Sequence, residues 1–335
     1  MTPWERLGAL ALDVDGYELE RRSVNVSSGF ERVTTTVLLH GGGLRGEGED
    51  VTYEAADHDG FPAGFDLSGS WTLASFSSAL GGRPLFAAPP AQHASFDYRR
   101  WAFESAALDL ALRQAGLSLA AAVDRPQRPV RFVVSTRGSV EGWLAADPSL
   151  EFKLDPESDW DAQLVGRLSA TGRVRVLDLK AHYPGSSVQL APDPAFYRMI
   201  AEGFPDCVIE DPALDDASLA ALSGAERRIS FDAPVHSLAD LDGLPITPRW
   251  LNVKPSRFGT LRGLLDCLEA CEQRGTSLYG GGQFELGPGR RQIQMLAAVF
   301  YPDGPNDVAP REYNVGEPRP GLPAGPLALP DAAGF

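Results

Sequence analysis

Three short apolar segments of the chain each end in an acidic residue. They read VRVLD, CVIE and RISFD, and they end at Asp178, Glu210 and Asp232. Steps of 32 residues (178 to 210) and 22 residues (210 to 232) are about one strand plus one helix. In a parallel barrel the strand ends open on one face, so the three carboxylates would converge there. Converging negative charges need a cation, and hard oxygen ligands favour Mg²⁺, with Mn²⁺ as an alternative.

A fourth segment, WLNVKPS, places a lysine where a base would be useful. Lys254 follows Asp232 by 22 residues, so the same spacing puts its amine on the same face. A partly desolvated lysine beside a dication has a lowered pKa, and we expect Lys254 to act as a base near neutral pH. The alternative for Lys254 is an ordinary ion pair with Asp232 or Glu210. The alternative for each carboxylate is a polar strand end without function.

The elements that must position these residues alternate between strands and helices from residue 129 onward. Short apolar runs predict strands at 130–135, 149–153, 173–178, 207–210, 229–232, 250–254 and 277–281. Longer amphipathic stretches predict helices at 159–170, 194–203, 216–224, 260–274 and 289–300. This alternation predicts a parallel sheet, and seven or eight such units favour a (β/α) barrel over an open sheet.

The residues before the barrel follow a different pattern. Alternating β-branched residues predict strands at 17–26 and 32–40, with a glycine turn at 41–43. Apolar residues at helical spacing predict a long helix over 98–119. The Pro/Gly-rich tail is expected to wrap the surface or to be partly disordered. We therefore expect three parts, which are an α+β domain over 1–125, a barrel over 126–310 and a tail over 311–335.

Composition narrows the classes of function. The 335 residues include 30 Lys and Arg against 45 Asp and Glu, a net charge of −15, and 43% are hydrophobic. The hydrophobic content excludes global disorder, and the acidic balance argues against nucleic-acid and membrane partners. Three cysteines cannot build a disulfide framework, and no apolar run approaches the ~20 residues that span a bilayer. We expect a cytoplasmic protein with a small-molecule partner, and a homo-oligomer is an open alternative to a monomer.

Together these motifs resemble the enolase superfamily, in particular its muconate-lactonizing and mandelate-racemase branches. The stretch YRRWAFESAALDLALRQAGLSL is similar to the segment that leads into the family's barrel, and LRGEGED is similar to its G-x-G-E turn. VRVLD, CVIEDP, RISFD and NVKPSRFGTL then follow in the family's order. The resemblance covers most of the chain. It implies an α/β fold, with a modified (β/α)₇β TIM-type barrel and an α+β N-terminal capping domain.

The resemblance also implies a first reaction step. A base removes the proton α to a substrate carboxylate, and Mg²⁺ stabilises the resulting enediolate. Asp178, Glu210 and Asp232 match the family's metal ligands, and Lys254 matches the acid/base on the sixth strand. The substrate is therefore expected to be a small carboxylic acid.

Two positions depart from the family's pattern. Muconate-type members carry Lys-x-Lys at the end of the second barrel strand, but this chain reads EFKLDP. Lys153 occupies the first lysine position, and Asp155 occupies the second. Lys180 stands where the family often has Asn, two residues after Asp178 and on the same side of the strand. It either returns a positive charge to the site, as a further catalytic candidate, or pairs with Asp155 or Glu210.

These departures separate the reactions that the site could perform. A two-base racemase or epimerase needs a base on each face of the substrate, and the loss of the second lysine disfavours it. One-base chemistry with Lys254 is the leading hypothesis, as a lyase that resembles o-succinylbenzoate synthase in its syn-elimination, or as a cycloisomerase. The alternatives are a metal-binding barrel that has lost catalysis, and an epimerase that pairs Lys254 with Lys180 or Lys153.

A glycine-rich segment, YGGGQFELGPGRRQ, is a candidate for substrate binding. It precedes a predicted helix, and a helix N-terminus beside glycine-rich backbone suits an anion. We expect this segment to hold the far carboxylate of the substrate, with Gly281 allowing close approach and Gln283 or Glu285 orienting it. A tight turn that only packs is the alternative.

Loops in the capping part are candidates for a lid. The segments 27–31 and 57–65 lie between predicted regular elements, and the family resemblance implies that such loops close over the barrel mouth. Phe30 and His58 would then line the lid and contact the substrate. An exposed surface loop explains these residues equally well.

Overall fold

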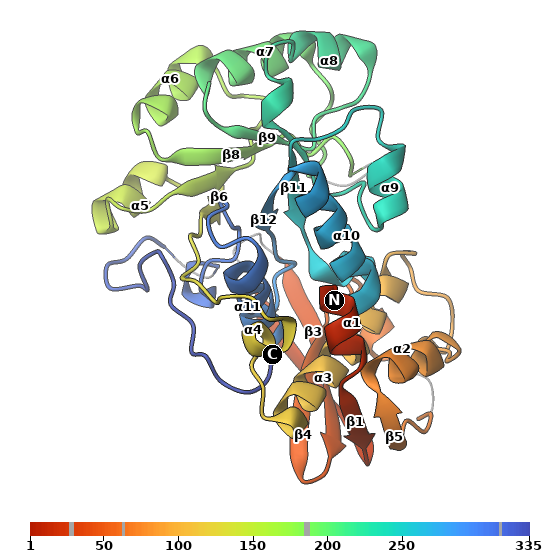
Figure 1. The fold of residues 1–335 in the computed structure, drawn as a ribbon. Coiled ribbons are helices and arrows are strands. Elements are labelled where there is room, and N and C mark those ends of the chain that lie inside the picture. The colour runs from red at the N-terminus through yellow and green to blue at the C-terminus, as the bar shows by residue number, and fades with distance from the viewer. Residues whose placement is uncertain (27–29, 62–63, 184–187, 315–316) are drawn as a thin grey trace.

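The computed structural model describes residues 1–26, 30–61, 64–183, 188–314 and 317–335. Parts of both predicted lid segments, at residues 27–29 and 62–63, therefore lie outside the described residues. The barrel elements occupy the upper half of Figure 1, and the capping elements occupy the lower half. The predicted fold class, a modified barrel with an α+β capping domain, is confirmed.

The capping domain is built on a three-stranded antiparallel sheet that packs against one long helix. The sheet has the order β2–β3–β4, and Val37 pairs with Gly48 in its register. The expected turn at LRGEGED is wrong, because these residues form strand β4. A Cβ atom on Gly48 would lie 1.9 Å from the carbonyl oxygen of Ala102 in α3. The glycines therefore serve the close contact between strand and helix. The elements are β2 (Gly16–Asn25), β3 (Glu31–Gly41), β4 (Leu44–Asp50) and α3 (Ser95–Ala115).

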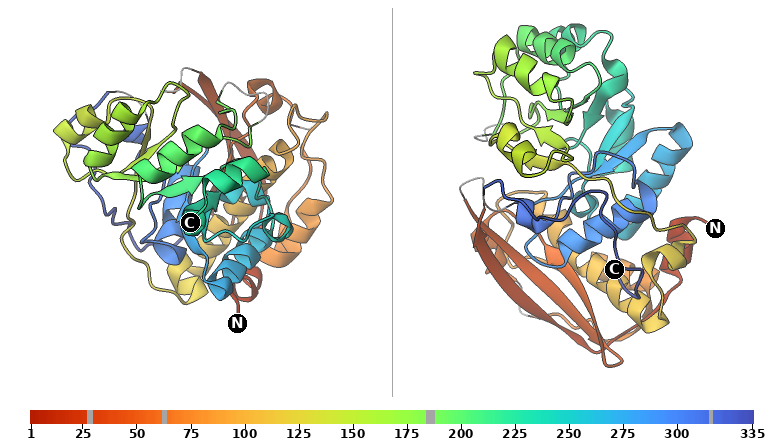
Figure 2. Two further views of the ribbon diagram at one scale, coloured as in Figure 1. Left: turned by 90° about the horizontal axis from the view of Figure 1, so that it is seen from above. Right: turned by 90° about the vertical axis from the view of Figure 1, so that its left-hand side faces the viewer.

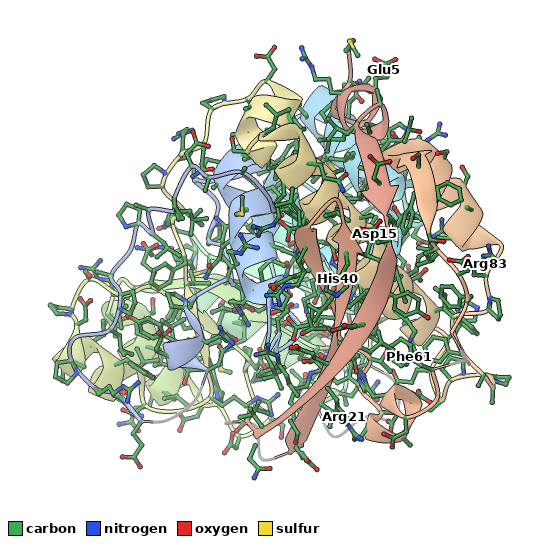
Figure 3. All side chains as sticks on the ribbon, turned by 90° about the horizontal axis from the view of Figure 1, so that it is seen from below. Glu5, Asp15, Arg21, His40, Phe61 and Arg83 are labelled. Carbon is green, nitrogen blue, oxygen red and sulfur yellow. The ribbon has the colours of Figure 1, made fainter. Side chains whose placement is uncertain are left out.

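Smaller elements complete the capping domain. Strands β1 and β5 pair antiparallel beside the main sheet. Viewed from below, Arg21 and His40 lie on the long exposed ribbon of β2 and β3 (Figure 3). The smaller elements are α1 (Pro3–Gly8), β1 (Ala11–Val14), the 3₁₀ helix η1 (Ala55–His58), β5 (Gly69–Thr72), α2 (Leu73–Gly81) and α4 (Leu119–Val123).

The barrel contains seven parallel strands that are neighbours in sequence order. The predicted strands and helices of this part are present, and α5 and α9 are added, each too short to show a periodic pattern. The strands are β6 (Val134–Thr136), β7 (Phe152–Leu154), β8 (Val174–Asp178), β9 (Val208–Glu210), β10 (Ile229–Phe231), β11 (Trp250–Val253) and β12 (Ser277–Gly280). The helices are α5 (Val140–Ala146), α6 (Ala162–Ala170), α7 (Pro194–Gly203), α8 (Asp216–Ala221), α9 (Leu238–Gly243), α10 (Leu261–Arg274) and α11 (Gly289–Phe300).

Local signals set the ends of the barrel helices. Helix α10 follows Thr260, whose hydroxyl oxygen accepts a hydrogen bond from the Gly263 N–H at 3.0 Å. The same helix stops at Gly275, which has a φ of 67°. Three 3₁₀ helices lie among the connections, and these are η2 (Glu226–Arg228), η3 (Pro255–Phe258) and η4 (Arg311–Tyr313).

Asn306 and Asp307, which follow the last barrel helix, take the place of an eighth strand. Asn306 bridges to Phe132 before β6, and Asp307 bridges to Gly281 after β12, so the two edges of the sheet are joined. The Asn306 side chain, 0% exposed, accepts from the Gly280 N–H at 2.7 Å and donates to the Arg131 carbonyl oxygen at 2.9 Å. Backbone bridges and one buried amide thus close the barrel together.

The tail runs back to the capping domain, as the position of the C-terminus in Figure 1 shows. Gly334 bridges to Ser118, and the Phe335 N–H donates to Asp109 Oδ1 at 2.7 Å. The Phe335 ring is fully buried and meets Trp101 edge-to-face. Of the two expectations for the tail, the described residues therefore follow the wrapped one.

Helix α3 lies between the capping sheet and the barrel (Figure 2), since it contacts β4 on one side and η3 on the other. Glu104 on this helix accepts a hydrogen bond from the Ser77 hydroxyl of α2 at 2.6 Å, and a longer one from the Leu261 N–H of α10 at 3.4 Å. The capping domain is therefore fastened to the barrel side on which β11 ends. No described helix is both long and apolar enough to cross a membrane.

Candidate functional site

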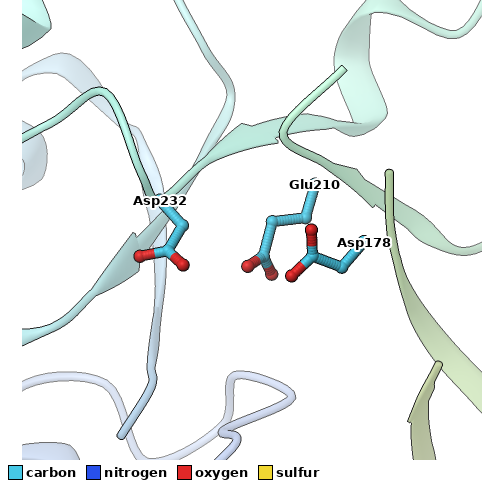
Figure 4. A group of neighbouring side chains, drawn as sticks. All are labelled: Asp178, Glu210 and Asp232. Atoms are coloured by element: carbon cyan, nitrogen blue, oxygen red, sulfur yellow. The ribbon is translucent and has the colours of Figure 1, made fainter. Parts of the chain in front are cut away.

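The three predicted ligands meet at the carboxyl ends of β8, β9 and β10 (Figure 4). One oxygen each from Asp178, Glu210 and Asp232 lies within 4.8 Å of the other two. Parallel register explains the convergence, because Asp178 pairs directly with Glu210 across β8 and β9. All three side chains are buried, with at most 1% exposure. We call these three residues the acidic trio.

Two lysines approach the trio from β7 and β8. The Lys153 Nζ lies 2.6 Å from Glu210 Oε1 and 3.1 Å from Asp178 Oδ2, and this side chain is 2% exposed. Lys180 forms an ion pair with Asp178, and its Nζ is 3.6 Å from Asp155 Oδ1. Lys180 therefore does both things that its position predicted, since it brings a positive charge to the site and it also faces Asp155.

The third lysine approaches from β11. The Lys254 Nζ lies 2.7 Å from Asp232 Oδ2, and Arg257 Nη1 lies 3.0 Å from Asp232 Oδ1. Burial opposes the charged amine, but Asp232 and Tyr183 outweigh burial and raise the pKa of Lys254 above its ordinary value. The short contact with a buried carboxylate favours the ammonium form of this amine. The lowered pKa was predicted for Lys254 beside a bound dication, and it stays a prediction.

These three lysines are the only lysines in the chain, and the other 27 basic residues are arginines. Arginine stays charged and presents a planar fork, whereas lysine is a compact point charge whose pKa shifts readily. Arginine occupies all 27 remaining positions of this kind, so Lys153, Lys180 and Lys254 carry the only lysine amines of the chain. All three side-chain lysine amines of the chain therefore lie at this site. This concentration is visible in the sequence, and our reading of the motifs missed it.

The charges around the trio leave room for a divalent cation. Six buried or half-buried carboxylates face five cationic side chains, so the fully ionised cluster carries one excess negative charge. Asp232 Oδ1 lies 3.0 Å from Arg257 Nη1, but this ion pair does not have the geometry of a hydrogen bond. A hard-oxygen donor set with excess negative charge fits Mg²⁺. The cluster comprises Lys153, Lys180, Lys254, Arg137, Arg257, Asp155, Asp178, Glu210, Asp211, Asp232 and Asp307.

The pKa values of the carboxyl groups reflect the same excess. Burial, with the charge of Asp178, raises the pKa of Glu210 to about 8. Burial, with the charge of Asp232, raises the pKa of Asp211 to about 7. Burial also opposes ionisation of Asp178, but Lys180 and other donors outweigh it and hold its pKa below the ordinary value. When Glu210 and Asp211 are protonated, they carry no charge. Protonation thus lowers the same excess negative charge that a bound dication would neutralise.

Three residues next to the site adopt left-handed backbone conformations that are uncommon outside glycine. Lys180 has a φ of 51°, Asp211 a φ of 49° and Phe284 a φ of 55°. The Asp211 carboxylate accepts hydrogen bonds from the N–H groups of Asp232 at 2.8 Å and Ala233 at 3.0 Å. Asp211 therefore holds the ligand that follows β10 in place. Strained backbone of this kind concentrates at functional sites.

The N–H groups of the glycine-rich segment after β12 bind a carboxylate, and this carboxylate is a side chain of the protein itself. Glu49 of β4 accepts hydrogen bonds from the N–H groups of Leu286, Gly287 and Gly289 at 2.6, 2.8 and 2.9 Å. The expectation that this helix N-terminus holds the substrate carboxylate is therefore wrong. Its donors are satisfied by a capping-domain carboxylate, and we call this contact the Glu49 latch.

The other predicted residues of that segment lie beside the latch. A Cβ atom on Gly281 would lie 2.5 Å from Asn252 Oδ1, so glycine is required for this contact. The Gln283 amide donates to Ser256 Oγ at 2.5 Å. Glu285 pairs with Arg290 at 3.1 Å. Their role in substrate binding stays a prediction.

The predicted lid residues have different surroundings. His58 is 5% exposed and interacts with Thr35 Oγ1 and the Thr52 carbonyl oxygen, each at 2.9 Å. Both of its ring nitrogens are thus used within the capping domain, and the prediction that it lines a lid does not fit this geometry. Phe30 meets Phe284 of the barrel edge-to-face, with 5.8 Å between ring centroids. Phe30 therefore does join the capping domain to the loop after β12.

Sequence reasoning missed several residues that surround the site. Arg257 is buried and donates to the Tyr183 hydroxyl at 3.3 Å. From the capping domain, Arg32 is fully buried, donates to the Gln283 carbonyl oxygen at 3.1 Å and stacks on Tyr53. The sequence signal for Arg257 was its place three residues after Lys254. No local signal marks Arg32, because its partners come from distant segments.

The fold of the chain can be compared with that of known proteins. A parallel barrel under a capping α+β domain is the fold of solved enolase-superfamily structures. The chain belongs to the family described as domain of unknown function DUF8230, whose N-terminal domain model matches residues 5–122 and whose C-terminal domain model matches residues 126–315. No curated protein matches the sequence.

Solved structures support the fold assignment. A mandelate racemase/muconate lactonizing protein from Herpetosiphon aurantiacus is similar with a TM-score of 0.68 and 16% identity, over 96% of this chain and 97% of that one. A dipeptide epimerase from Methylococcus capsulatus, complexed with Mg and the dipeptide L-Arg-D-Lys, has a TM-score of 0.65 and 19% identity over 87% and 89%. A muconate cycloisomerase from Pseudomonas fluorescens has a TM-score of 0.63 and 17% identity over 89% and 87%. Likeness at this identity shows the fold.

Proposed function

We propose that this protein is a Mg²⁺-dependent enzyme that removes the proton α to the carboxylate of a small carboxylic acid. The observation that carries the proposal is the gathering of the chain's only three lysines around three convergent, buried carboxylates. The proton beside a carboxylate is very weakly acidic, so its removal needs both a positioned base and cations near the developing charge. The site supplies both from its own residues. We further propose a cytoplasmic location.

Asp178, Glu210 and Asp232 would hold the metal, with Mg²⁺ as the first expectation and Mn²⁺ as the alternative. A bound dication supplies Lewis-acid stabilisation for negative charge that develops on the substrate carboxylate. Lys153 lies beneath Asp178 and Glu210, is 2% exposed, and keeps their oxygens oriented. Lys254 is the base, because its amine is 11% exposed at the end of β11 and can give up its proton when its partner carboxylate is neutralised.

One-base chemistry is the leading reaction type, either as a lyase or as a cycloisomerase. Asp155, which stands where a catalytic lysine is expected, pairs with Arg137 at 3.1 Å and faces Lys180. Asp155 therefore does not supply the second amine that two-base chemistry would need at this position. Lys254 would therefore both take and return the proton.

An epimerase or racemase is the second candidate, and one observation favours it. Lys180 pairs with Asp178 and Lys254 pairs with Asp232, so the two amines lie at opposite ends of the trio. A substrate held between them would meet an amine on each side. The similarity to a dipeptide epimerase is consistent with this candidate.

Two measurements test the proposal. Calorimetry should detect Mg²⁺ uptake that is lost in Asp178→Asn. In D₂O, a panel of dipeptides, acid sugars, muconates and succinylbenzoate precursors should reveal Mg²⁺-dependent deuterium exchange at the α-carbon of at least one acid. Lys254→Ala should keep metal uptake and the folded state while exchange falls by about 1,000-fold or more. Arg262→Ala, on the exposed face of α10, is the matched control.

Two outcomes would contradict it. Exchange that persists in Lys254→Ala overturns the assignment of the base. A folded protein that takes up no Mg²⁺ at millimolar concentration overturns the whole proposal, whereas uptake without any exchange would favour a binding protein that has lost catalysis.

A further inference from the structure

A cleft of about 590 Å³ lies between the capping domain, helix α11 and the tail, away from the acidic trio. Its walls include five arginines in a protein whose net charge is −15. Arg22 and Arg113 come from the capping domain, Arg290 and Arg291 from α11, and Arg311 from the tail. Such a concentration of one charge sign runs against the charge of the whole molecule.

Acidic residues offset part of this charge. Among the described residues, Glu47 and Glu312 line the cleft, and Glu47 is paired with Arg45 at 2.5 Å. Three of the five arginines have a carboxylate partner, because Arg22 pairs with Glu20 at 3.5 Å, Arg113 with Asp109 at 3.0 Å and Arg290 with Glu285 at 3.1 Å. Arg291 and Arg311 form no ion pair within the described part of the chain and carry the positive charge of the cleft.

The buried arginine of α11 has a donor left over. Arg290 is 7% exposed, and its Nη2 is 3.1 Å from Glu285 Oε2. Its Nε is buried and has no hydrogen-bond partner among the described residues. The Arg290 Nε is enclosed by protein and does not open to the cleft. Within the described part of the chain, Arg291 forms no ion pair, and Arg311 donates to the neutral Leu286 carbonyl oxygen. These two guanidinium groups are therefore the ones that an anionic ligand could neutralise.

We propose that this cleft is a second ligand site, which binds a small molecule carrying two or more phosphate groups. Guanidinium groups match phosphate oxygens through paired hydrogen bonds, and several of them converge here. A ligand with two phosphate groups can contact more than one guanidinium group, and this short-range attraction must outweigh the repulsion from the net charge of −15. Pro288, Pro310, Leu327 and Leu329 add an apolar wall for the organic part of such a ligand.

Binding there would tie three parts of the molecule together. The ligand would contact the capping domain, α11 and the tail at once, and Gly287 and Pro288 of its wall flank the Glu49 latch. A ligand that binds only the folded protein raises the unfolding temperature. This proposal does not depend on the function of the acidic trio.

Calorimetry with inorganic pyrophosphate in metal-free buffer at physiological ionic strength tests the site. We expect saturable binding, accompanied by a higher unfolding temperature. The double variant R291Q/R311Q should bind about tenfold or more weakly, while R262Q, which changes an exposed arginine of α10, should bind as the wild type does. Lys254→Ala should also leave the affinity unchanged, which separates this cleft from the acidic trio.

Three results would contradict the proposed second ligand site. Absence of pyrophosphate binding at 10 mM, roughly the weakest affinity of use in a cell, overturns the proposal. Equal weakening in R262Q or Lys254→Ala places binding elsewhere and also overturns it. A parallel titration with citrate distinguishes the ligand class, because tighter binding of citrate than of pyrophosphate would contradict the phosphate assignment.

Discussion

At the scale of single residues, the exchange between positions 155 and 180 is the most informative feature of the site. Asp155 stands where a lysine was expected, and Lys180 stands where an amide was expected, yet the Lys180 Nζ lies 3.6 Å from Asp155 Oδ1. The amine is thus supplied from the neighbouring strand. The two positions together still supply one amine, but Asp155 and Lys180 sum to no net charge, whereas a lysine and an amide would carry one positive charge.

Replacement of Lys180 should separate the two candidate reactions. Lys180→Met removes one cation beside Asp178, and we expect α-proton exchange to fall about 100-fold without a change in its stereochemistry, a loss typical of one missing electrostatic donor. Proton NMR in D₂O with both substrate configurations measures this. Mg²⁺ uptake is the control for folding. Complete loss of exchange from one configuration, with exchange from the other preserved, would instead identify Lys180 as a second base.

At the scale of elements, the Glu49 latch explains how a strand of the capping domain positions a barrel loop. Glu49 lies at the end of β4 that faces the barrel, is 1% exposed, and satisfies three N–H groups at the start of α11. The negative charge also suits the positive end of that helix. The loop that carries Gln283 and Glu285 is therefore shaped by another domain.

Removal of the latch should loosen this loop. Glu49→Ala leaves three buried N–H groups without their acceptor, and we expect about 3 kcal/mol or more of lost stability. Urea unfolding measures the loss, and hydrogen exchange should accelerate at Leu286, Gly287 and Gly289. Glu47→Ala, two residues earlier on β4, is the matched control and should change stability by less than about 1 kcal/mol. Equal effects of the two variants would argue against the latch.

Glu104 on α3 predicts a pH dependence of stability. Burial raises the pKa of this carboxyl above its ordinary value of 4.5, so the folded state holds its proton more tightly than the unfolded chain does. The contribution of Glu104 is therefore favourable below pH 4.5 and is lost as the pH rises through the folded-state pKa. We expect the unfolding temperature of Glu104→Gln, relative to wild type, to increase between pH 4 and 7.

Thermal scans across that range, with Glu202→Gln on the exposed face of α7 as the control, measure the trend. A difference between Glu104→Gln and wild type that is the same at every pH would show that the raised pKa does not influence folding.

At the scale of the whole molecule, one buried side chain adds to the backbone bridges that close the barrel. The Asn306 amide accepts from the Gly280 N–H and donates to three carbonyl oxygens, those of Arg131, Tyr301 and Gly304. Arg131 precedes β6 and Gly280 ends β12, so the two edges of the sheet are held by one residue. Asp307, the next residue, reaches Lys153 at 3.8 Å and links the closure to the site.

Asn306→Ala should therefore destabilise the whole barrel. The variant leaves the Gly280 N–H and the Arg131 carbonyl without this partner, whereas the carbonyl oxygens of Tyr301 and Gly304 keep backbone donors, and we expect a loss of about 2–4 kcal/mol. Chemical denaturation measures this loss, with Asn25→Ala on the exposed ribbon of β2 as the control. A loss within 0.5 kcal/mol, which is roughly the spread for surface changes, would mean that the backbone bridges suffice for closure.

The sequence alone determined the order and positions of the barrel elements and the identity of the acidic trio. Helix caps and β-branched runs act over a few residues, so the chain carries these signals locally. Asp178 and Glu210 could be assigned to one face because neighbouring parallel strands end together. The same logic placed Lys254 beside them before any partner was known.

Only the tertiary structure determined which charged side chains contact one another and which backbone groups they bind. The carboxylate that fills the helix N-terminus at Gly287 comes from Glu49, 238 residues away along the chain. The pKa of Lys254 depends on its 2.7 Å contact with Asp232, which no spacing reveals. Barrel closure by Asn306 and the burial of Phe335 likewise join distant segments. Local patterns specify elements, but ion pairs and buried hydrogen bonds depend on distances that exist only after the chain has folded.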